Sequence, residues 1–129
     1  MLKYLVIALG LAFAGTAHAH TDGKFTKGPH GGHLIDAGGG KQHWEVVASG
    51  GDLTLYVTNK DEKPVDTTGG KAEAQVLVGG KTFAVTFSPS GGNTMKGSGP
   101  FEAAQEMRII LKTTGVGGDS FQARLTPLQ

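Results

Sequence analysis

The sequence lacks cysteine altogether, and it has few aromatic side chains and no large excess of either charge. Without cysteine, neither a disulfide framework nor a thiolate metal cage can form. The 12 Lys and Arg residues nearly balance the 11 Asp and Glu residues, and no basic stripe is visible, so nucleic acid is disfavoured as a partner. A Walker loop, a His-Glu-x-x-His motif and a Gly-x-Ser-x-Gly motif are all missing. We therefore expect a protein that is not an enzyme.

Residues 1–19 have the pattern of a secretory signal peptide. Lys3 supplies the positive charge, residues 5–14 supply the apolar run, and Ala17-His18-Ala19 is a small-x-small cleavage site. The apolar run is shorter than a membrane span requires, with an uncleaved anchor as the alternative. We expect an exported protein that begins at His20 and has no stable membrane insertion after processing.

The rest of the chain is long enough for one domain, and its apolar residues recur with a period of two. Over residues 42–49, Trp44 and His43 fall on opposite faces of a strand, and residues 52–58 alternate in the same way. Glycine pairs between such segments indicate hairpins. We predict strands over residues 33–36, 42–49, 52–58, 72–78, 81–87, 93–98, 106–113 and 120–126.

Glycine is abundant, and its 22 residues discourage long helices because each interior glycine costs about 1 kcal/mol relative to alanine. No segment offers the crossover helix that parallel strands need. The sequence predicts an all-β protein, a small antiparallel β-sandwich of seven or eight short strands, with a small β-barrel as the alternative. We expect this domain to span residues 33–129, after a flexible arm rich in His and Gly over residues 20–32.

The histidines that follow the leader all lie near the start of the chain. We predict a metal site formed by His20, His30, His33 and His43. Cleavage after Ala19 would leave a free amine beside the imidazole of His20, which together make a chelate. Solvated histidines without a ligand are the alternative interpretation. An oxygen-activating copper centre at an N-terminal histidine is the one enzymatic alternative.

Local sequence supports three of these ligands. His30 and His33 are separated by two glycines, whose permissive backbone can turn both rings toward one point. His43 shares a strand face with Glu45, and a carboxylate from Glu45 or Asp36 could complete the site. Imidazole ligands suit copper, zinc, nickel and cobalt, and affinity alone favours Cu(II).

Methionine gives a second, weaker hypothesis. Met95 and Met107 are the only methionines after the leader, and a thioether suits Cu(I). Trp44 could cover such a site through a cation–π contact. Filling of the core is the preferred interpretation of both methionines.

Part of the sequence resembles a group of small exported proteins of Gram-negative bacteria. It also resembles the extra N-terminal domain of periplasmic adaptor subunits in heavy-metal efflux pumps of the resistance-nodulation-division type. The similarity covers residues 27–87 and rests on Gly28-Pro29-His30-Gly31-Gly32-His33-Leu34, Glu45-Val46-Val47, residues 53–58 and Lys63-Pro64-Val65. It implies a periplasmic β-domain associated with copper, zinc, cobalt or nickel. The coiled-coil hairpin and lipoyl-like half of an adaptor are missing.

A fainter likeness concerns the start of the processed chain. Ala17-His18-Ala19-His20 is similar to the start of CopC-type periplasmic copper carriers, which are small β-sandwiches whose mature chains begin with histidine. The rest of the sequence departs from that family, and its Met-rich copper segments are missing. The likeness is therefore one of position and fold.

From these features we expect a periplasmic protein that carries, buffers or senses a divalent d-block ion, with copper as the first candidate and zinc, nickel or cobalt as alternatives. A periplasmic efflux or envelope component is the expected protein partner. The competing hypothesis is an interaction domain without metal, which docks onto an envelope complex through a sheet edge.

Overall fold

The period of two in the sequence gives eight strands, each with one face toward a shared core. The computed structural model describes residues 26–128, so the predicted signal peptide and residues 20–25 of the predicted arm lie outside it. The strands are β1 (His33–Ala37), β2 (Gln42–Ser49), β3 (Asp52–Asn59), β4 (Lys71–Val78), β5 (Lys81–Pro89), β6 (Thr94–Ser98), β7 (Arg108–Thr114) and β8 (Gln122–Leu125).

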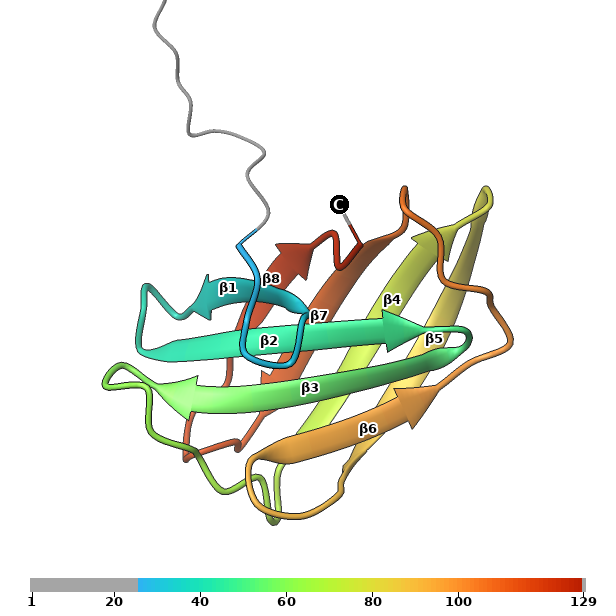
Figure 1. Cartoon of the computed structure of the whole chain (residues 1–129). Coiled ribbons are helices and arrows are strands. Elements are labelled where there is room, and N and C mark those ends of the chain that lie inside the picture. Colours follow the sequence, from blue (N-terminus) through green and yellow to red (C-terminus); the bar gives the residue numbers. More distant parts are fainter. Residues whose placement is uncertain (1–25, 129) are drawn as a thin grey trace, which may run out of the picture.

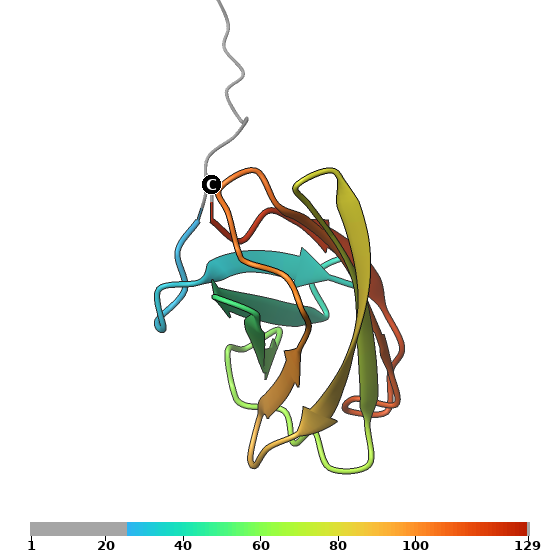
Figure 2. The ribbon, with the colours of Figure 1, turned by 90° about the vertical axis from the view of Figure 1, so that its right-hand side faces the viewer.

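All neighbouring strands are antiparallel, and they form one sheet in the order β1-β2-β3-β6-β5-β4-β7-β8. The sheet folds over, so that β1, β2, β3 and β6 lie in front of β4, β5, β7 and β8 in Figure 1. The two layers are seen from the side in Figure 2. Because β1 and β8 also contact each other, the sheet is nearly closed. The predicted all-β antiparallel fold is confirmed, in a barrel-like form in which one continuous sheet supplies both layers.

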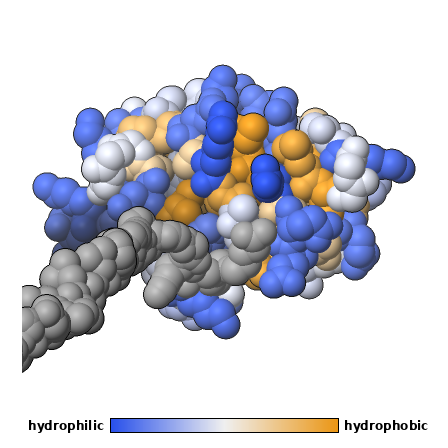
Figure 3. All heavy atoms as spheres, turned by 90° about the horizontal axis from the view of Figure 1, so that it is seen from above, coloured by the Kyte–Doolittle hydropathy of each residue, from blue (hydrophilic) through white to orange (hydrophobic). Residues whose placement is uncertain are grey.

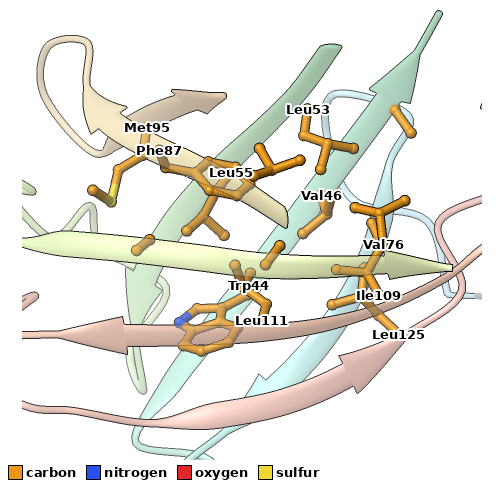
Figure 4. Packing of buried hydrophobic residues seen from close by; sticks show 14 of the residues in the cluster. Trp44, Val46, Leu53, Leu55, Val76, Phe87, Met95, Ile109, Leu111 and Leu125 are labelled. Atoms are coloured by element: carbon orange, nitrogen blue, oxygen red, sulfur yellow. The ribbon is translucent and has the colours of Figure 1, made fainter. Parts of the chain in front are cut away.

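The core fills the space between the two layers, where inward side chains of facing strands interdigitate (Figure 4). Trp44 is fully buried there, and its Nε1 donates a hydrogen bond to Gln42 Oε1 over 3.0 Å. Met95 and Met107 are also fully buried in this apolar cluster. Both methionines therefore pack in the core, in agreement with the preferred interpretation of them.

Residues 26–32 form a defined turn rather than the end of a flexible arm, and we call this segment the arm turn. Lys27 forms a β-bridge with His33, and the Leu34 amide donates to the Thr26 carbonyl over 2.8 Å. The segment crosses in front of β2 in Figure 1. Its position over the outer face of the sheet creates the site described next.

Within residues 26–128 there is no helix, and hence none that is long and apolar enough to cross a membrane.

Candidate functional site

Alternation along β2 sends Trp44 into the core and the two residues beside it, His43 and Glu45, to the outer face of the sheet. The register of the strands places Tyr56 of β3 opposite Glu45. On the other side of β2, Asp36 of β1 lies opposite His43. Side chains directly opposite each other on one face are close enough to interact. The outer face of β1, β2 and β3 thus gathers two carboxylates, an imidazole and a phenol.

Glu45 is only 2% exposed although it is on the outer face, because the arm turn covers it. Its Oε2 accepts hydrogen bonds from the His30 amide over 2.7 Å and from the Gly32 amide over 2.9 Å. Its Oε1 lies 2.7 Å from His30 Nδ1. A Cβ on Gly28 would overlap the Glu45 carboxyl group, so a larger residue there would displace that side chain. The Gly-Pro-His-Gly-Gly motif is therefore a turn built around a buried carboxylate.

His30 has a fixed orientation in this turn. Its ring stacks on Tyr56 with the ring centroids 3.7 Å apart and the planes within 3°. With Nδ1 bound to Glu45 and 46% of the side chain exposed, Nε2 is the nitrogen available to a ligand. No local pattern marked Tyr56 as a site residue, because its stacking partner His30 lies 26 positions away.

His43 repeats the same arrangement at the next cross-strand position. Its Nδ1 lies 2.7 Å from Asp36 Oδ1, and its side chain is 25% exposed. In the part of the chain that the structure describes, Nε2 has no hydrogen-bond partner on either His30 or His43. Both imidazoles are thus held through Nδ1 by a carboxylate.

His30 and His43 line the same hollow, a pocket of about 280 Å³ that we call the acidic pocket. Three carboxylate residues, Asp36, Glu45 and Glu62, line it as well, and no Lys or Arg does. Such a lining gives a negative potential that concentrates cations.

Glu62 enters the acidic pocket from the loop that follows β3. It is the one residue other than glycine with a positive φ in residues 26–128, at 62°. Its amide donates to the Asn59 carbonyl over 2.9 Å, and Asn59 Oδ1 accepts from the amides of Asp61 and Lys63. Glycine would adopt this backbone more easily, so glutamate is strained at this position. The strained residue places its carboxylate at the rim of the acidic pocket.

His33 lies away from the acidic pocket. It is the first residue of β1, and the outward residues of that strand that line the acidic pocket are Leu34 and Asp36. His33 instead lines a different pocket, together with Thr126. The Thr126 amide donates to His33 Nδ1 over 3.2 Å. The two glycines before His33 do allow a tight turn, but the turn directs His30 to the outer face and His33 to the seam between β1 and β8. The convergence expected of these two rings is not found.

Burial of the His33 ring lowers its pKa below the ordinary value of 6.5. The unfolded chain then binds a proton at a higher pH than the folded chain does. The stability that neutral His33 provides is therefore complete above about pH 6.5, and it is lost as the pH falls through the lower pKa of the folded state. We expect the free energy of unfolding to fall more steeply below pH 6.5 in the wild type than in His33→Asn, whose amide oxygen can accept the Thr126 bond. Urea denaturation from pH 7.5 to 4.5 measures this, and equal slopes would contradict it.

The structure thus places the four predicted ligands as follows. His30 and His43 share one pocket, His33 lies in another, and His20 lies outside the described residues. Among residues 26–128, no group of three or more His, Asp or Glu side chains is arranged to hold a metal ion.

Comparison of the chain with protein-family models, with curated proteins and with solved structures found no match.

Proposed function

We propose that this protein is an exported metal-binding protein that carries or buffers a divalent d-block ion, with His30 and His43 as its ligands in the acidic pocket. The observation that carries the proposal is the joint lining of that pocket by two imidazoles and three carboxylate residues, without Lys or Arg. Export and a periplasmic location are part of the proposal, and they are supported by the leader pattern and by the resemblance at Gly28-Pro29-His30-Gly31-Gly32.

The carboxylates support this role through the second nitrogen of each ring. Histidines that bind metals nearly always donate their other N–H to a carboxylate, a carbonyl or water, which fixes the ring and raises the basicity of the ligating nitrogen. Glu45 does this for His30, and Asp36 does it for His43. In this proposal Glu45 and Asp36 orient the ligands, whereas the sequence had suggested one of them as a direct ligand.

Two imidazoles and water give an exchangeable site rather than a closed structural one, which suits a carrier or a buffer. Among divalent ions, Cu(II) is expected to bind such nitrogen ligands most tightly, with zinc, nickel and cobalt weaker. A link to heavy-metal homeostasis or efflux is part of the proposal and is supported by the sequence resemblance alone.

Titration of the processed protein with Cu(II) at pH 7.4 tests the proposal. We expect a dissociation constant of about 10 μM or lower, and about a 10-fold or greater loss in His30→Ala/His43→Ala. His33→Asn is the matched control, because it removes a histidine that does not line the acidic pocket. A His20→Ala variant measures separately what the N-terminal residue adds.

The location of the ion decides between this proposal and its alternative. Cu(II) is paramagnetic and should broaden the amide NMR signals of Tyr56 and Thr58, which line the acidic pocket. Broadening confined to residues near His20, or the same affinity in the double variant, would show that the pocket is not the site. Absence of any binding at 10 μM would favour the interaction domain that docks through a sheet edge.

A further inference from the structure

The pocket that His33 lines has charged residues of the opposite sign from those of the acidic pocket. It has a volume of about 400 Å³ and lies where β4 and β8 end and β1 and β7 begin. Arg108 and Arg124 line it, and no Asp or Glu does. We call it the arginine pocket.

The two arginines are brought together by the register of β7 and β8. Arg124 lies opposite Ile110, and Arg108 is two positions before Ile110 on the same face of β7, so the arginines are diagonal neighbours. Neither forms an ion pair with a carboxylate within residues 26–128, where both ion pairs involve histidine. Two like charges placed diagonally repel each other, and an anion bound between them would remove that cost.

The rest of the arginine pocket is largely apolar. Leu77 lies opposite Arg108 on β4 and is 39% exposed; among the large apolar residues of 26–128, only Leu77 and Leu128 are this exposed. Ile110 and Leu125 also line the pocket. Figure 3 views this end of the molecule from above and shows apolar side chains exposed in its middle, with hydrophilic groups around them.

We propose that the arginine pocket binds a small amphiphilic carboxylate, with its apolar chain against Leu77, Ile110 and Leu125 and its carboxylate between Arg108 and Arg124. An apolar hollow with a few convergent polar groups is the usual form of a small-molecule site, and its volume lies in the usual range. Paired guanidinium groups suit a carboxylate because they donate in a planar fork. This site is independent of the proposed metal function.

Octanoate is the probe, and amide NMR titration of the processed protein without metal is the measurement. We expect saturable shifts at Leu77, Ile110 and Arg124, with a dissociation constant on the order of 100 μM. Butyrate, which has a shorter chain, and 1-octanol, which has no charge, should each bind at least about 10-fold more weakly.

The Arg108→Gln/Arg124→Gln variant should weaken octanoate binding at least about 10-fold. Lys112→Gln is the matched control, since it removes a cation from an exposed position of β7 outside this pocket. Equal binding of 1-octanol, unchanged affinity in the double arginine variant, or shifts confined to other strands would each overturn the proposal.

Discussion

Replacement of Glu45 by alanine is expected to lower the free energy of unfolding by about 2 kcal/mol, a large effect for a charged residue on the outer face of a sheet. The carboxylate accepts hydrogen bonds from two backbone amides and lies 2.7 Å from the Nδ1 of His30. Alanine leaves the buried Gly32 amide without its partner, which costs about 1–3 kcal/mol. The loss is limited because the arm turn can detach from β2 while the rest of the sheet stays folded.

Urea denaturation of the wild type, Glu45→Ala and Glu73→Ala measures the effect. Glu73 is an exposed residue of β4, so its loss should change stability by less than about 0.5 kcal/mol. Hydrogen exchange adds a local readout, because the Gly32 amide should lose protection in Glu45→Ala alone. If both variants are equally stable, the carboxylate does not hold the arm turn.

The strands could be predicted because the signal for them is local. Alternation and a glycine pair defined the hairpin of β2 and β3, and the predicted bounds 42–49 agree with Gln42–Ser49. The last two strands begin two residues later than predicted, at Arg108 and Gln122. Another kind of error occurred where pairing over long range extends a strand. β5 continues to Pro89, beyond the predicted end at residue 87, because Ser88 and Pro89 pair with Lys96 and Met95 of β6. Local alternation carries no information about such a partner.

The site could be predicted only in part, for the same reason. Alternation correctly placed His43 and Glu45 on one face, opposite Trp44. The arm turn depends on contacts with Glu45, which lies 15 positions after His30. The two glycines between His30 and His33 showed that the backbone could turn, but the direction of the turn is set by that distant carboxylate. The divergence of His30 and His33 therefore could not be derived from their spacing.

The positive φ of Glu62 shows a second limit of local reasoning. Glutamate is not a residue that favours the left-handed region, so composition alone assigned the loop after β3 no special backbone. In the structure this residue adds a third carboxylate residue to the acidic pocket. The charge of the pocket thus comes from three separate parts of the chain, which only the folded sheet brings together.

A glycine of the arm turn gives the second large effect. Gly32→Ala is expected to lower the free energy of unfolding by about 1–3 kcal/mol. The added Cβ would lie 2.4 Å from the Val46 carbonyl oxygen, a backbone atom that cannot rotate away. The arm turn would have to move outward, and the bond from the Gly32 amide to Glu45 would lengthen. The two residues should therefore be coupled energetically.

A double-mutant cycle of Gly32→Ala and Glu45→Ala tests this coupling by urea denaturation. Once Glu45 is absent, the arm turn is free to move, so the alanine should cost about 1 kcal/mol less than in the wild-type background. Gly39→Ala is the control, because its cost comes from a φ of 70° in a turn with no atom near the added Cβ. That cost should be the same with and without Glu45, within about 0.5 kcal/mol. Additivity of Gly32→Ala with Glu45→Ala would mean that the arm turn is held to β2 by contacts other than the buried carboxylate.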